Sequence, residues 1–270
     1  MAIKNSSAQL PQELDQKEIH SFLLKISTAA RAITLKYFRK TVNVENKEQT
    51  SFDPVTVADR EAENAIRDLI AQYFPDHNIF GEEWEPKKTN SAFSWIIDPI
   101  DGTRAFISGL PVWGTLAALC YEGRPIAGLM SQPHIGEDFI GFAGNTTLHR
   151  GDEKSTLSTS KVKALNEATM FTTSPRIFLN ENSLAHYDKL EANMRLARYG
   201  LDCYGYAMVA AGHGELVVEE GLKDVDIAAM VPIVEGAGGI VTTWSGKPVT
   251  DGGQVIAAAN PNIHEAALEI

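Results

Sequence analysis

The stretch FSWIIDPIDGTRAFISG, residues 93–109, decides how the whole chain is interpreted. Five of the six residues before Asp98 are apolar, which predicts a buried strand that ends at this carboxylate. Asp101 follows three positions later, across a proline and directly before Gly102. Burying two carboxylates beside such a strand is costly unless a positive group compensates them. The candidates are a helix N-terminus, a basic side chain or a metal ion.

The segment DPIDGT, residues 98–103, allows two interpretations. If Thr103 or Arg104 begins a helix, its free N–H groups and positive dipole end form an anion site beside the carboxylates. A Mg²⁺ ion shared by the carboxylates and a substrate phosphate would use both features. The alternative is a turn set by proline and glycine, in which Asp101 simply caps a helix. These six residues do not decide between the two.

Other acidic residues stand at the ends of predicted elements. Glu82 follows a glycine in the segment GEEW, Asp59 precedes one predicted helix, and Asp226 precedes another. Taken singly, Asp59 and Asp226 fit helix caps. A layered fold could nevertheless bring them together, and divalent ions held by carboxylates and carbonyls suit phosphoester hydrolysis.

The hydrophobic pattern predicts a layered α/β protein with two halves, 1–150 and 151–270, divided in the polar, Ser/Thr-rich region 146–160. The first half has expected helices at 12–40 and 60–74 and expected strands at 93–98, 114–121, 124–133 and 137–144. The second half has expected strands at 168–174, 196–200, 214–220, 239–244 and 254–260, and expected helices at 182–194, 204–212, 226–236 and the C-terminus.

Composition narrows the class of protein. The 35 acidic and 24 basic residues give a net charge of -11, which argues against nucleic acid or an anionic membrane as the main partner. Cys120 and Cys203 lie in apolar surroundings without zinc-ligand spacing, which favours a reducing compartment. No signal segment is recognised, and no apolar run approaches the roughly 18 residues of a membrane span. We therefore expect a soluble, cytoplasmic protein.

Four motifs, in this order, resemble the inositol monophosphatase superfamily: GEE at 81–83, WIIDPIDGT at 95–103, VDIAA at 225–229 and EGAGG at 235–239. The resemblance spans roughly residues 22–270. It implies a layered αβαβα sandwich of the inositol monophosphatase and fructose-1,6-bisphosphatase type, a homodimer, and a metal-dependent, lithium-sensitive phosphatase. One departure is Val225, because many members have tryptophan directly before the last metal-binding aspartate.

The resemblance also implies roles for individual residues. Two or three Mg²⁺ ions would be held by Glu82, Asp98, Asp101, Asp226 and the carbonyl oxygen of Ile100. The backbone N–H groups of Gly102 and Thr103 would bind the substrate phosphate, while Asp59 would bond Thr103 and help to orient the attacking water. Water activated by two metal ions would then displace the alcohol of a phosphate ester directly, with Asp59, Glu82 and Thr103 as catalytic residues.

Two longer segments, 101–119 and 198–219, resemble the histidinol-phosphatase branch through Arg104, residues 113–115 and residues 202–204. By this resemblance Arg104, Asp202, Glu219 and Asp226 contact the substrate. Two carboxylates suit the ammonium and imidazole groups of histidinol phosphate, although Glu219 would also accept sugar hydroxyls and Asp202 would also fit a helix cap. The alternatives are an inositol or broad-specificity sugar monophosphatase and, more remotely, a regulatory binding protein on the same fold.

Overall fold

The computed structural model describes residues 14–41, 44–46, 54–249 and 251–270. The first residues of the expected helix at 12–40 therefore lie outside the described part, and the helix itself, α1, spans Gln16–Tyr37. Asp15 caps it, since its carboxylate accepts from the backbone N–H of Lys17 at 2.8 Å.

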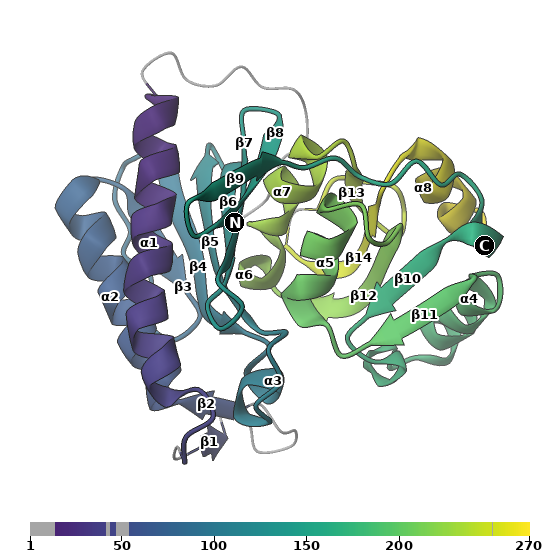
Figure 1. The fold of residues 1–270 in the computed structure, drawn as a ribbon, viewed down its shortest axis with the longest axis horizontal. Coiled ribbons are helices and arrows are strands. Elements are labelled where there is room, and N and C mark those ends of the chain that lie inside the picture. Colours follow the sequence, from purple (N-terminus) through teal and green to yellow (C-terminus); the bar gives the residue numbers. More distant parts are fainter. Residues whose placement is uncertain (1–13, 42–43, 47–53, 250) are drawn as a thin grey trace.

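The elements stack in five layers, α, β, α, β and α (Figure 1). Helices α1 and α2 (Val57–Tyr73) cover the outer face of the first sheet. Helices α5 (Asp202–Ala210), α6 (Asp224–Ile227) and α7 (Met230–Gly236) lie between the two sheets. Helices α4 (Glu181–Ala192) and α8 (Pro261–Leu268) cover the far face of the second sheet. This arrangement confirms the predicted fold class.

The first sheet has seven strands in the order β3-β4-β5-β6-β7-β8-β9. Its strands β3 and β4 are parallel, and the other neighbours are antiparallel. Their bounds are β3 Asn78–Gly81, β4 Phe93–Asp101, β5 Gly114–Tyr121, β6 Arg124–Gln132, β7 Glu137–Phe142, β8 Asn145–Arg150 and β9 Glu153–Thr156. A separate antiparallel pair, β1 (Val44–Asn46) and β2 (Pro54–Thr56), precedes α2, and the short helix α3 (Thr103–Ile107) follows β4.

The second sheet has five strands in the order β11-β10-β12-β14-β13. Their bounds are β10 Thr169–Thr172, β11 Leu196–Tyr199, β12 Leu216–Leu222, β13 Ile240–Thr243 and β14 Gly253–Ala258. Two single 3₁₀ turns, η1 (Leu165–Glu167) and η2 (Pro175–Ile177), flank β10. The chain therefore changes sheets between β9 and β10, whereas the proposed division at residue 150 lies in the β8–β9 hairpin.

One predicted element is two elements in the structure. The expected helix at 226–236 is broken into α6 and α7, with Ala228 and Ala229 between them. Pro232 explains the break, because proline cannot donate to the carbonyl oxygen four residues earlier, which belongs to Ala228, and its ring crowds that group.

Three of the four apolar clusters fill the spaces between these layers. The inner one is large, and it joins residues of the first sheet, such as Leu116 and Met130, to α5, α7 and β12. In the described part of the chain, no helix combines the length and apolar character needed to span a bilayer.

Candidate active site

A bulge at the end of β4 places Asp98 and Asp101 on the same face of the sheet. Asp98 pairs with Leu116 and Asp101 pairs with Gly114, so three steps along β4 match only two steps along β5. In a regular strand, residues three apart would point to opposite faces. The extra residue in the bulge corrects this alternation and turns both carboxylates toward one cavity.

Asp226 approaches the same point from the other half of the chain. It lies in α6, and its Oδ2 accepts a hydrogen bond from the backbone N–H of Lys223 at 2.7 Å. One carboxylate oxygen from each of Asp98, Asp101 and Asp226 lies within 4.8 Å of the others. Among the described residues, this is the group of three or more His, Cys, Asp or Glu side chains that could hold a metal ion.

The three carboxylates are electrostatically strained without a cation. Burial raises the pKa of Asp98 well above its usual value, and the nearby charges of Glu82 and Asp101 raise it further. Burial and Asp226 raise the pKa of Asp101 in the same way. Burial raises the pKa of Asp226 to about 6, although the N–H of Lys223 opposes the shift. A divalent cation would compensate these charges.

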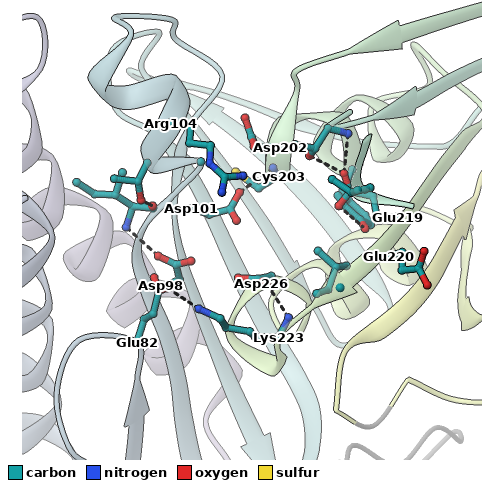
Figure 2. A pocket seen from close by; sticks show the side chains of 18 residues that line it. Glu82, Asp98, Asp101, Arg104, Asp202, Cys203, Glu219, Glu220, Lys223 and Asp226 are labelled. Atoms are coloured by element: carbon teal, nitrogen blue, oxygen red, sulfur yellow. Dashed lines mark hydrogen bonds and ion pairs between the residues drawn. The ribbon is translucent and has the colours of Figure 1, made fainter. Parts of the chain in front are cut away.

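Glu82 lies beside this group on a loop that follows β3. Its Oε1 accepts from the Lys223 Nζ at 3.2 Å, across the cavity (Figure 2). It lines the same cavity as the three aspartates but is not one of the mutually close set. The structure thus brings all five predicted metal-binding residues to one cavity and leaves Glu82 engaged by the Lys223 ammonium group.

Side chains of α2 form hydrogen bonds with the backbone of the loop that carries Glu82. The carboxylate of Glu63, which is fully buried, accepts from the Glu83 backbone N–H at 2.7 Å and from Arg67 Nε at 2.8 Å. Arg67 also donates to the Trp84 carbonyl oxygen at 3.0 Å. A Cβ at Gly81 would lie 2.0 Å from Glu63 Oε1, so any larger residue there would displace the Glu63 carboxylate.

The predicted phosphate loop joins β4 to α3. Gly102, with φ +79°, adopts a left-handed conformation that favours glycine and precedes Thr103, the first residue of α3. Thr103 Oγ1 donates to the Ile100 carbonyl oxygen at 3.1 Å, and Thr115 Oγ1 donates to the Pro99 carbonyl oxygen at 2.8 Å. These bonds fix the turn. Gly102, Thr103 and the backbone of Ile100 border the cavity, as Arg104 does.

Asp59 lies buried behind this turn in the first turn of α2. Its Oδ2 accepts from the N–H and the Oγ1–H of Thr56, at 2.8 and 2.7 Å, in a capping box. Its charge also contributes to the raised pKa of Asp98, after burial and the nearer carboxylates. Asp59 therefore takes part in capping α2 as the third residue of the helix, whereas the N-cap itself is Thr56. Its bond to Thr103 stays a prediction.

The cavity of about 250 Å³ extends from the aspartates toward a second acidic wall. Asp202 and Glu219 stand on this wall (Figure 2), together with the partly apolar surfaces of Ile177, Tyr206 and Leu222. Glu219 Oε1 accepts from both the N–H and the hydroxyl of Thr173, at 2.8 and 2.6 Å, while Oε2 accepts from Tyr206 Oη at 3.3 Å.

Asp202 has an unusual backbone for a residue with a side chain. Its φ is +45°, and it begins α5 without a side-chain cap hydrogen bond at that end of the helix. It packs on the phosphate loop, because a side chain at Gly102 would meet Asp202 Cγ at 3.0 Å. Burial raises the pKa of Asp202 to about 6, and Arg104 opposes that shift. The capping alternative thus has no support in the geometry of α5.

Several residues of the site were not predicted. Glu63 and Lys223 are charged residues in ordinary helical and polar contexts, and Thr115, Thr173 and Tyr206 are common core or strand residues. These residues contact partners that are distant in the sequence. Thr173, for example, donates to Glu219, 46 residues further along the chain. The one usable local signal was Lys223, three residues before Asp226, which is the spacing of a helix cap.

Comparisons with known proteins agree with this geometry. The model of the Inositol monophosphatase family matches residues 15–270. A chloroplastic bifunctional phosphatase of Arabidopsis thaliana is 41% identical over 279 residues, which cover 98% of this chain and 79% of that protein. A histidinol-phosphatase of Chlorobaculum parvum is 36% identical, covering 88% and 90%. An inositol monophosphatase from Zymomonas mobilis has a similar structure, with TM-score 0.84, 38% identity, and 95% and 98% coverage.

Proposed function

Because the chain belongs to the inositol monophosphatase family, and is therefore a phosphomonoester hydrolase, we propose that it hydrolyses histidinol phosphate in a Mg²⁺-dependent reaction. The family is metal-dependent, while the identity of the metal and of the substrate are parts of the proposal. The predicted homodimer and cytoplasmic location remain predictions.

The donor set fits a hard divalent cation. Asp98, Asp101 and Asp226 offer only carboxylate oxygens, and neither histidine nor cysteine belongs to their group. Oxygen ligands are those that Mg²⁺ prefers, whereas zinc sites are usually built from nitrogen and sulfur. We assign Glu82 and the Ile100 carbonyl oxygen to the same set. When bound, such ions lower the pKa of a water molecule and neutralise charge on the leaving oxygen.

The protein's own groups would position the reactants. The backbone N–H groups of Gly102 and Thr103 would hold the phosphate in front of the aspartates. Asp59, acting through Thr103, would orient the attacking water. The turn between β4 and α3 is already fixed by its own hydrogen bonds, so little ordering is required when the ester binds.

We assign the substrate specificity to the second acidic wall of the cavity. Asp202 and Glu219 are both buried enough to have raised pKa values, and Ile177, Tyr206 and Leu222 add apolar surface beside them. A leaving group with an ammonium and an imidazole matches carboxylates on an apolar wall. A polyol such as inositol would need several hydrogen-bond partners in place of the apolar surface.

The experiment compares phosphate release from histidinol phosphate and from myo-inositol 1-phosphate, with Mg²⁺ and with a chelator. We expect kcat/KM for histidinol phosphate to exceed that for the inositol ester at least 10-fold, and the chelator to abolish both. Asp202→Asn should reduce kcat/KM for histidinol phosphate by more than 10-fold and affect the inositol ester much less. Asparagine tolerates the left-handed backbone of this position, so the variant isolates the charge.

Asp188→Asn, on the exposed face of α4, is the matched control and should leave both rates unchanged. A preference for the inositol ester would support the proposed phosphatase activity and reject histidinol phosphate as its substrate. An absence of turnover of either ester with Mg²⁺ present would favour the regulatory binding protein.

A further inference from the structure

Lys223 contacts two predicted metal ligands that come from different halves of the chain. It is the last residue before α6, directly after β12. Its backbone N–H donates to Asp226 Oδ2 at 2.7 Å, while its Nζ lies 3.2 Å from Glu82 Oε1. Figure 2 shows the side chain extended across the cavity toward Glu82. The ammonium group therefore already contacts an oxygen that a cation bound by Glu82 could use.

We propose that Lys223 is an internal cation that competes with a divalent metal ion for Glu82, and that its ammonium group turns to the substrate phosphate when the metal binds. This inference rests on the proposed metal-dependent function.

The two carboxylates differ in how they use Lys223. The bond from the backbone N–H to Asp226 is a fixed feature of the start of α6 and is compatible with metal binding. The ion pair with Glu82 is different, because an ammonium group and a dication repel each other when they share one carboxylate. Glu82 itself is well shielded, with 14% of its side chain exposed, so this repulsion is screened less than at the surface.

Lys223 is able to move once it is displaced. Its side chain is 56% exposed, and a lysine side chain is flexible with three rotatable donors. A phosphate in front of Gly102 and Thr103 would be a new anionic partner within the same cavity, which Lys223 already borders. The exchange of Glu82 for phosphate would couple metal loading to substrate binding.

The test uses Lys223→Met, which keeps the length of the side chain and removes its charge. Calorimetric titration of the full-length, metal-free protein with Mn²⁺, without substrate, should give a 3- to 10-fold lower Kd for the variant than for the wild type. With the metal saturating, the Kd for inorganic phosphate should be 3- to 10-fold higher in the variant. Lys223→Arg, which keeps the charge, should stay near the wild type in both titrations.

Two controls isolate the effect. Lys247→Met removes an exposed lysine elsewhere and should change neither Kd. In a Glu82→Gln background, Lys223→Met should no longer tighten Mn²⁺ binding, because the carboxylate for which the two cations compete is gone. Thermal melts of each variant establish that it is folded.

The outcomes separate this inference from the proposed function. A wild type that binds no Mn²⁺ would reject the metal-dependent function and the inference together. Mn²⁺ binding by the wild type with an equal or higher Kd in Lys223→Met would reject the competition alone. Tighter Mn²⁺ binding with unchanged phosphate affinity would reject the transfer of Lys223 to phosphate.

Discussion

The buried carboxylate of Glu219 illustrates how a single residue can be costly for stability. Burial raises its pKa to about 7, although the N–H and hydroxyl of Thr173 oppose the shift. The folded protein therefore binds this proton more tightly than the unfolded chain, in which the pKa is near 4.5. The resulting stabilisation is fully present below pH 4.5 and is lost as the pH rises through about 7.

We predict that Glu219→Gln becomes more stable relative to the wild type as the pH rises. The amide oxygen can still accept from Thr173, and the amide N–H₂ can donate to Tyr206 Oη, whose hydroxyl hydrogen then loses its acceptor. That loss is the same at every pH, so the pH trend reports the carboxylate alone. Between pH 5 and pH 8, the difference in free energy of unfolding should shift by on the order of 2 kcal/mol in favour of the variant. Urea unfolding in the presence of a chelator measures it.

The exposed Glu153→Gln in β9 is the control and should show no such trend. A pH-independent difference for Glu219→Gln would mean that Glu219 is already ionised in the folded protein at pH 5.

Single residues were predictable where their chemistry is local. Asp98 and Asp101 were singled out because two carboxylates after an apolar strand require a positive partner, whereas their role as metal ligands was predicted only from the family resemblance. The bulge that puts them on one face was not predicted, because it depends on the pairing of β4 with β5. Glu63 was not identified for a similar reason, since its partner Glu83 is 20 residues away on another element.

At the scale of elements, the buried Glu63 carboxylate on α2 connects this helix to the loop after β3 by a hydrogen bond. The carboxylate accepts on both oxygens, and Gly81 allows the loop to approach it closely. In Glu63→Gln, one side-chain oxygen becomes an N–H₂ group facing another donor, which leaves a buried donor without a partner.

We predict that Glu63→Gln lowers the free energy of unfolding by about 1–3 kcal/mol and raises the Mg²⁺ concentration for half-maximal activity several-fold. The value of kcat at saturating Mg²⁺ should fall much less, because Glu63 positions Glu82 and touches no reacting atom. Chemical unfolding and Mg²⁺ titration of the activity measure the two effects.

Glu61→Gln on the same helix is the matched control, because its side chain is 42% exposed and pairs with Lys36 at 3.6 Å. It should change both quantities little. An unchanged Mg²⁺ requirement in Glu63→Gln would show that the loop carrying Glu82 is positioned without the hydrogen bonds that Glu63 accepts.

Helices and strands were predictable where their sequence pattern is strongly apolar. Their prediction failed where the pattern is polar or interrupted. Strand β5 is almost continuously buried and was expected with its bounds as observed. The hairpin of β8 and β9 was missed because β9 is exposed throughout and its sequence is polar. The break between α6 and α7 could have been inferred from Pro232, whose position inside an apolar helical pattern interrupts it.

At the scale of the whole molecule, the acidic cluster is a junction between the two halves. Asp98 and Asp101 belong to the seven-stranded sheet, whereas Asp226 belongs to α6 after the second sheet. Without a cation, the like charges of these buried groups would oppose contact between the halves. A bound cation would reverse this effect, because it would bind the folded chain, in which the three carboxylates converge.

We therefore predict that the order of the Tm values of the wild type and Asp226→Asn reverses when Mg²⁺ is added. Asparagine Oδ1 can still accept from the Lys223 N–H, so the start of α6 is retained, while one of three repelling charges is removed. With a chelator, the variant should therefore have a higher Tm than the wild type. With millimolar Mg²⁺, the wild-type Tm should rise by several degrees and the variant's should rise much less. Asp188→Asn should follow the wild type in both conditions, and a wild-type Tm insensitive to Mg²⁺ would contradict a metal junction between the halves.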